Sequence, residues 1–264
     1  MRKRGGRDKM KYHTSYATNI GTRKEINQDA LLLKAANTIT GQVVFAAVCD
    51  GMGGLEKGEL ASKEAVTALN EWFLQKFPIF LKQGFEVEGL RKQWEQILYQ
   101  LNEDFICYGE EHSCHIGTTL TAMLLIEEKY YIFHVGDTAI YAVNDNITKL
   151  TKDHTLAQKK VETGELTQEQ AKSDPGKNIL LQAVGTGKTI LPDFIIGDIE
   201  HNTTYLLCSD GFRNQLAEQE ILENIRETDM QVEDKITETL THMQQTVMDR
   251  REKDNITAVA IYCI

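Results

Sequence analysis

The chain has 264 residues, of which 41% are hydrophobic and 26% charged, and its formal net charge at pH 7 is -10. This length allows one large domain with a buried core, and no Pro-rich or Ser/Gly-rich linker divides it. The acidic balance argues against a nucleic-acid-binding protein, which usually carries a basic face. No run approaches the roughly 18 apolar residues of a membrane span, so no membrane partner is expected.

The chain begins with a basic segment. Residues 1–11 contain six Lys and Arg side chains and no apolar run follows them, which predicts a disordered tail rather than a secretory signal. Residues 12–264 are expected to form a single domain. The five cysteines are scattered and include no CxxC pair, which indicates free thiols in a reducing compartment, so we expect a cytoplasmic protein.

Apolar runs and helical stripes follow in chain order. Runs rich in β-branched or aromatic residues predict strands over residues 30–33, 43–49, 119–126, 130–135, 139–143, 204–208 and 256–262. Apolar residues at helical spacing predict helices over residues 59–77, 90–108, 218–226 and 232–248. Because strands and helices are segregated rather than alternating, the order predicts an α+β domain with helices packed outside antiparallel sheets.

The least regular part of the chain is the span 153–189, which mixes four glycines with many charges. Long segments of this kind in compact domains are typical of binding loops or lids. Within it, the sequence Gly185-Thr-Gly187-Lys188-Thr189 is similar to the end of a phosphate-binding loop. Gln182 stands where the complete motif needs a glycine, so we predict a turn there instead.

Acidic residues stand at the ends of the apolar runs. Each could be a plain turn residue, since Asp-Gly is a common turn dipeptide. Carboxylates beside buried strands are costly unless paired with cations, and few Lys or Arg residues lie near these ones. Oxygen ligands favour Mg²⁺ or Mn²⁺ over Zn²⁺, so divalent ions would account for the set together. The aspartates at these positions are Asp29, Asp50, Asp137, Asp210 and Asp254.

Short motifs containing these acids occur in a fixed order. They are Gly21-Thr-Arg23, Asn27-Gln28-Asp29, Asp50-Gly51-Met52-Gly53-Gly54, Gly136-Asp137-Thr138, Ser209-Asp210-Gly211 and Asp254-Asn255-Ile256-Thr257. The ordered set resembles the PPM family of metal-dependent protein phosphatases, the protein phosphatase 2C type, and especially its compact bacterial members. The likeness covers residues 16–261, and the span 153–189 resembles the flap of these phosphatases.

This resemblance implies a fold, an activity and partners. The fold is two stacked antiparallel β-sheets flanked by helices, an α-β-β-α sandwich with the metals at one end. The activity is hydrolysis of phosphoserine and phosphothreonine in proteins by a water that two Mn²⁺ or Mg²⁺ ions activate. The implied partners are phosphorylated proteins, and with them a Ser/Thr kinase and its substrates.

The resemblance also assigns the metal ligands. Asp50 is expected to bridge both ions, and the Gly51 carbonyl to ligate one of them. Asp210 and Asp254 are expected to hold the other ion. Asp29 is expected to act close to the metals, partly through bound waters.

The resemblance implies roles for two further residues, and the sequence differs from the family pattern at three places. Asp137 is expected to support a third, weaker metal site near the flap, and Arg23 to grip the substrate phosphate. Gln28 replaces a Glu that some members carry, and Ala139 stands in the place of the usual Arg. Met52 replaces a histidine of eukaryotic members and cannot donate a proton, which leaves the general acid unassigned.

Two other functions stay open at this stage. One is a catalytically silent module that keeps the fold and binds partners. The intact acidic set argues against it, because a binding module has no need to hold such acids together. The other is a two-metal phosphoesterase that acts on nucleotides or other small molecules.

Overall fold

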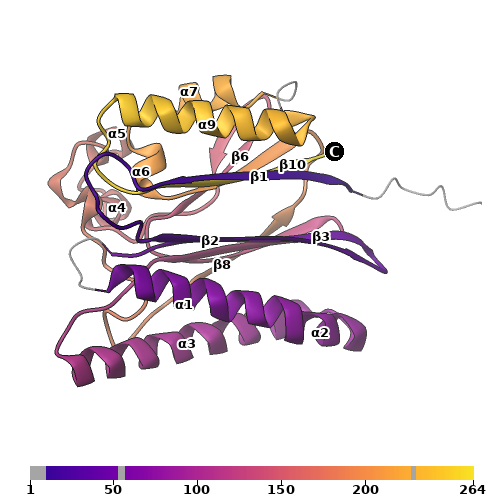
Figure 1. Cartoon of the computed structure of the whole chain (residues 1–264), viewed down its shortest axis with the longest axis horizontal. Helices are drawn as coiled ribbons and strands as arrows, with labels where there is room; N and C mark the ends of the chain where they lie inside the picture. The colour runs from indigo at the N-terminus through magenta and orange to yellow at the C-terminus, as the bar shows by residue number, and fades with distance from the viewer. Residues whose placement is uncertain (1–9, 53–56, 227–229) are drawn as a thin grey trace, which may run out of the picture.

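The computed structural model describes residues 10–52, 57–226 and 230–264. Two antiparallel five-stranded sheets stack face to face, and helices cover both outer surfaces (Figure 1). The strand order is β1-β10-β9-β6-β7 in one sheet, here the β10 sheet, and β2-β3-β4-β5-β8 in the other, the β3 sheet. The predicted α-β-β-α sandwich is therefore confirmed. The basic tail, except for Met10 and Lys11, and the Gly53-Gly54 pair lie outside the described residues.

The elements have the following bounds. The strands of the β10 sheet are β1 (Tyr12–Asn19), β6 (Ala139–Val143), β7 (Ile147–Lys149), β9 (Thr203–Cys208) and β10 (Ile256–Cys263). Those of the β3 sheet are β2 (Asp29–Thr38), β3 (Gly41–Asp50), β4 (Leu120–Ile126), β5 (Lys129–Val135) and β8 (Asp193–Asp198). The long helices are α1 (Gly58–Glu71), α3 (Val87–His112) and α9 (Glu233–Asp249). The shorter helices are α2 (Phe77–Gln83), α4 (Leu156–Glu162), α5 (Gln168–Ala171), α6 (Asp210–Arg213) and α7 (Glu218–Asn224).

The central strands are mainly apolar because both of their faces are largely buried. In β3, Val44 points into the layer between the sheets, whereas Phe45 packs under α1 and α3. The Phe45 ring lies 5.3 Å from that of Trp72 and 5.8 Å from that of Trp94, measured between centroids. Strands covered on both faces appear in a sequence as continuous apolar runs, which is why these strands could be predicted.

Some local predictions differ from the structure. The helix expected over 59–77 ends as α1 at Glu71, and a π-helical segment, η1 (Trp72–Lys76), joins it to α2. Pro78 lies in the first turn of α2, which directly follows η1. The span 153–189 was expected to be irregular but contains α4, α5 and a 3₁₀ turn, η2 (Pro175–Asn178). Among the described helices, none combines the length and apolar character that crossing a bilayer requires.

Strand register brings the acidic ends together. In the β2–β3 hairpin Asp29 pairs directly with Asp50, while Thr38 pairs with Gly41 beside the turn at the opposite end. In the β10 sheet, pairing of Ala258 with Cys208 places the start of β10 beside the end of β9. These ends lie at the left side of the molecule, where α1 begins (Figure 1).

Candidate metal centre

Asp50 is held by its backbone, which leaves its carboxylate available. Its N–H donates to Thr119 Oγ1 at 2.8 Å. Its carbonyl oxygen accepts from the Thr119 N–H and from Thr118 Oγ1, both at 2.9 Å. Since three hydrogen bonds fix the main chain, the side chain of Asp50 projects from a rigid strand end toward the other acids.

Gly51 occupies a space that no other residue fits. Its N–H donates to the Gln28 carbonyl at 3.0 Å, and Ser62 Oγ donates to the same oxygen at 2.6 Å. A Cβ at this position would collide with the carbonyl oxygens of Gly58 and Gln28. The glycine thus lets the β3 end, the segment before β2 and the start of α1 meet without a gap.

Asn255 ties the loop that carries Arg23 to the β10 sheet. Its Nδ2 donates to the carbonyls of Ile20 at 2.9 Å and Ile26 at 3.2 Å, and its Oδ1 accepts from the Gln28 N–H at 2.9 Å. Asn255 is buried. Its place in the Asp254-Asn255 pair was the one signal in the sequence, and its anchoring role was missed.

Burial and mutual repulsion raise the pKa values of Asp29, Asp50 and Asp210. Burial raises the pKa of Asp29 to about 7, with Asp210 and Asp254 adding to the shift and nearby hydroxyls of Thr257 and Ser209 opposing it. Burial, and then Asp29, raise the pKa of Asp50 well above its usual range. The pKa of Asp210 is also raised, first by burial. The five predicted acids therefore belong to one electrostatic group.

Several buried oxygens in this group are left without a hydrogen bond. Among the described residues, neither carboxylate oxygen of Asp29 nor Oδ1 of Asp210 has a partner of normal geometry. Buried oxygens without donors are costly, whereas a hard divalent cation would satisfy them. The donor set, all oxygen, fits Mg²⁺ or Mn²⁺.

The acids do not form a closed cage. Within residues 10–52, 57–226 and 230–264, no three His, Cys, Asp or Glu side chains are already spaced to hold one ion. Mg²⁺ commonly keeps several waters and takes only one or two carboxylates. The arrangement is therefore compatible with a divalent cation that keeps several of its waters.

Two cationic side chains lie on the loop between β1 and β2. Lys24 Nζ forms an ion pair with Asp254 Oδ1 at 2.8 Å, so this lysine already neutralises part of the cluster. Sequence reasoning missed Lys24. Arg23 is exposed, and no residue in the described part of the chain forms a hydrogen bond or ion pair with its guanidinium. The guanidinium is therefore available to a ligand.

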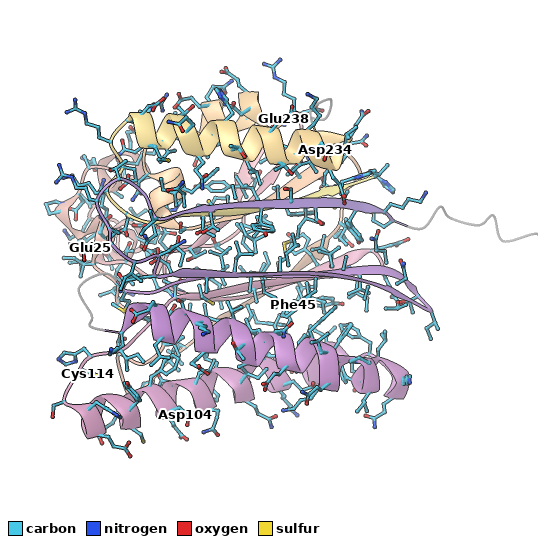
Figure 2. The ribbon with its side chains drawn as sticks, viewed as in Figure 1. Glu25, Phe45, Asp104, Cys114, Asp234 and Glu238 are labelled. Carbon is cyan, nitrogen blue, oxygen red and sulfur yellow. The ribbon has the colours of Figure 1, made fainter. Side chains whose placement is uncertain are left out.

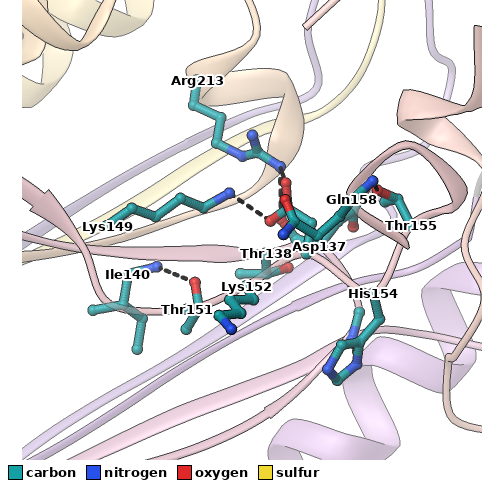
Figure 3. Close-up of polar contacts among 12 residues, drawn as sticks. Asp137, Thr138, Ile140, Lys149, Thr151, Lys152, His154, Thr155, Gln158 and Arg213 are labelled. Atoms are coloured by element: carbon teal, nitrogen blue, oxygen red, sulfur yellow. Dashed lines mark hydrogen bonds and ion pairs between the residues drawn. The ribbon is translucent and has the colours of Figure 1, made fainter. Parts of the chain in front are cut away.

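Asp137 sits beside a buried group of charges. Burial raises its pKa to about 7, and Asp210 adds to the shift while Arg213 opposes it. Arg213 Nη2 donates to the Asp137 carbonyl at 2.9 Å and to Asp153 Oδ2 at 3.0 Å. Lys149 Nζ bonds the other oxygen of Asp153 at 2.6 Å. Figure 3 shows Arg213 and Lys149 pointing toward the same place next to Asp137.

The raised pKa values predict a pH dependence for the metal-free protein. Because the pKa values of Asp29 and Asp137 rise from 3.8 to about 7, the native state holds protons that the unfolded chain has released. The free energy of unfolding should therefore fall as the pH rises through this window. His134 acts in the opposite direction, since burial lowers its pKa to about 4. Urea unfolding in EDTA should show a net loss of about 2 kcal/mol between about pH 6 and about pH 7.

Saturating Mn²⁺ provides the comparison for this measurement. Bound cations stabilise the ionised carboxylates, so the loss on raising the pH should disappear when Mn²⁺ is present. If the metal-free protein instead became more stable over this interval, the acids would already be ionised, and the repulsion inferred from their burial would be wrong.

Solved structures share this sandwich. Serine/threonine phosphatase Stp1 from Staphylococcus aureus superposes with a TM-score of 0.80 at 27% identity, covering 94% of each chain. The catalytic domain of the serine/threonine protein phosphatase PstP, in complex with two manganese ions, gives a TM-score of 0.74 at 25% identity, covering 97% of this chain and 99% of that one. The fold is thus that of bacterial Ser/Thr phosphatases.

The sequence comparisons identify the family. The family model described as Protein phosphatase 2C matches residues 20–255, and the chain belongs to this family. Protein phosphatase PhpP of Streptococcus pneumoniae is 30% identical over 249 residues, which cover 94% of this chain and 96% of PhpP. Serine/threonine phosphatase stp of Listeria monocytogenes is 32% identical over 182 residues, covering 68% and 70%. The chain is therefore a protein Ser/Thr phosphatase with phosphoprotein substrates, and its family supports a dependence on divalent metals.

Proposed function

We propose that this phosphatase hydrolyses phosphoserine and phosphothreonine with two divalent ions, Mn²⁺ or Mg²⁺, held between the ends of its two sheets. The observation that carries the proposal is the single electrostatic group formed by acids from both sheets. Asp50, whose charge interacts with those of four other aspartates, would help to hold both ions. The Gly51 carbonyl would help to hold one of them, and Asp210 and Asp254 the other.

Bound divalent ions supply a Lewis acid that polarises the phosphoryl oxygens and lowers the pKa of water. The chain's own residues position the water and the phosphate. Asp29, directly opposite Asp50, orients water through its two buried oxygens. Arg23 presents its guanidinium fork to the phosphate oxygens, with which it can form two parallel hydrogen bonds. Since Met52 carries no transferable proton, a water or another group must protonate the leaving oxygen.

The remaining assignments extend the same site. Asp137 is proposed to support a third, weaker ion beside the segment 153–189, which would act as a flap. A Ser/Thr kinase that phosphorylates the same substrates is the proposed functional counterpart. The five free cysteines, three of them buried, support action in the cytoplasm.

The test compares three substrate conditions. Purified protein with MnCl₂ should hydrolyse a phosphothreonine peptide, and EDTA in excess should reduce the rate to background because the acids need cations. A phosphodiester, bis(p-nitrophenyl) phosphate, should react much more slowly than the peptide. Faster hydrolysis of the diester would favour a small-molecule phosphoesterase. No hydrolysis of either substrate with Mn²⁺ present would identify a silent binding module.

A further inference from the structure

A depression of about 570 Å³ lies beside the metal centre, at the C-terminal end of α3. Three segments form its walls: the end of α3, the loop that follows it, and the loop 185–188. Met52, the residue after the Gly51 ligand position, forms the side nearest the metals. We refer to this depression as the Met52 pocket. Figure 2 shows Cys114, one of its lining residues, at the same end of the molecule as Glu25.

The Met52 pocket has an apolar floor and a charged rim. Phe105 and Ile116 are buried beneath it, and Met52 and Ile106 are half-buried on its sides. The lining also includes three exposed titratable residues, Glu110, His115 and Lys188. Unlike Phe105, Ile106 is not part of the core cluster under α1 and α3, so its side chain is available to contact a ligand. Such a surface suits an apolar side chain that belongs to an otherwise polar peptide.

A buried asparagine holds the wall of the pocket in place. Asn102 Nδ2 donates to the Gly187 carbonyl at 2.9 Å, and its Oδ1 accepts from the Gly185 N–H at 2.8 Å. Asn102 is only 4% exposed. This double hydrogen bond fixes the loop 185–187 against α3, which makes the pocket a formed feature of the fold rather than a gap between loose segments.

Glycines keep the pocket open. At Gly117, a Cβ would lie 3.2 Å from Met52 Sδ and 3.1 Å from Thr186 Cγ2, so a larger residue would push both side chains. At Gly185, where φ is +90°, a Cβ would lie 2.9 Å from Phe105 Cβ. Small residues at these points allow the backbone to pass behind the pocket without filling it.

The backbone links the pocket directly to the metal centre. The Met52 N–H donates to the Gly117 carbonyl at 3.1 Å, one residue beyond Gly51. An extended peptide advances about 3.3 Å per residue, so a chain whose phosphorylated residue occupies the metal centre reaches the pocket within a few residues. The thioether of Met52 is an adaptable apolar surface suited to such a contact.

We propose that the Met52 pocket binds an apolar side chain of the phosphoprotein substrate, located two or three residues from the phosphorylated residue. The pocket thus contributes to the choice among phosphoproteins, whereas the metal centre recognises the phosphate. This inference rests on the proposed phosphatase mechanism, and it assigns Met52 and Ile106 to substrate selection.

The test uses phosphothreonine peptides that differ at one position. Each peptide carries Leu or Ser at one of the positions two or three residues before or after the phosphothreonine. At one position, Leu should raise kcat/KM about tenfold over Ser, the scale expected for burying such a side chain. p-Nitrophenyl phosphate, which has no flanking chain, reports the metal centre alone.

Two variants act on opposite walls. Ile106→Asp places a charge on the apolar side. Gly187→Leu fills the space, since among the described residues a Cβ there meets only Thr189 O at 3.8 Å. Both should remove the preference for Leu and change kcat/KM for p-nitrophenyl phosphate by less than about twofold. Tyr99→Asp is the matched control, because Tyr99 is exposed on α3 two turns before Ile106, away from the pocket. It should keep the preference.

The outcomes separate the two proposals. If p-nitrophenyl phosphate and the peptides are hydrolysed but Leu is preferred at none of the four positions, the pocket proposal is wrong and the metal mechanism stands. A preference that survives both pocket variants also overturns it. If the Mn²⁺-loaded protein hydrolyses neither kind of substrate, the proposed function itself fails.

Discussion

Asp50→Asn is expected to lower kcat/KM for a phosphothreonine peptide by at least about a thousandfold in saturating Mn²⁺. Asp50 is the acid whose charge is coupled to all four of the others. Its amide replacement keeps the size of the side chain and the backbone hydrogen bonds to Thr119. The same variant should be at least as stable as the wild type in EDTA, because one source of repulsion among buried carboxylates is removed.

The two readouts together distinguish a ligand from a structural residue. A structural role would lower both activity and stability, whereas a ligand role lowers activity and the stabilisation that Mn²⁺ provides. Thermal unfolding with increasing Mn²⁺ measures the second quantity. Asp145→Asn, in the exposed turn between β6 and β7, is the control and should leave both unchanged. Near-normal turnover by Asp50→Asn would refute the assignment.

Arg213→Met is expected to lower the free energy of unfolding by about 3 kcal/mol. The guanidinium is the shared partner of the Asp153 carboxylate and the Asp137 carbonyl, and its removal leaves Asp153 paired only with Lys149. Arg213 and Asp153 are 16% and 17% exposed, so solvent compensates only partly for the lost pair. Urea unfolding measures the change.

The control for this variant uses an exposed arginine. Arg226→Met, just beyond α7, should change the free energy of unfolding by less than about 0.5 kcal/mol. Adding Asp153→Asn to Arg213→Met should not recover the loss, because the Lys149 ammonium then loses its remaining carboxylate partner. A cost below about 1 kcal/mol for Arg213→Met would show that the buried pair contributes little.

The sequence predicted the central strands but not the edges of the sheets. Strands β1, β7 and β8 were missed, and all three are edge strands; β2, at the remaining edge, was predicted only over 30–33. An edge strand has one neighbour and buries less of its surface, as the mixed burial of β8 illustrates. Its apolar pattern is correspondingly weak, whereas β4 and β10 are buried along their whole length.

The residues of the site were likewise predictable only in part. The acids could be predicted because each adjoins an apolar run, and the structure brings Asp29, Asp50, Asp137, Asp210 and Asp254 into one electrostatic group. Their supporting residues could not, because they act across long separations. Arg213 reaches the Asp137 carbonyl over 76 positions and Asn255 reaches Ile26 over 229. Ala139 lacks the guanidinium expected next to Asp137, and α6 provides one instead.

The turn at Ile39-Thr40 sets the register of the β2–β3 hairpin and so determines which residues stand opposite each other at the metal centre. The strands pair without interruption from Thr38–Gly41 to Asp29–Asp50, a span of about 30 Å. Deleting one residue from that turn would slip one strand against the other and turn its side chains to the opposite face. Such a shortened protein could keep every acidic residue and still be inactive, because Asp29 would no longer stand opposite Asp50.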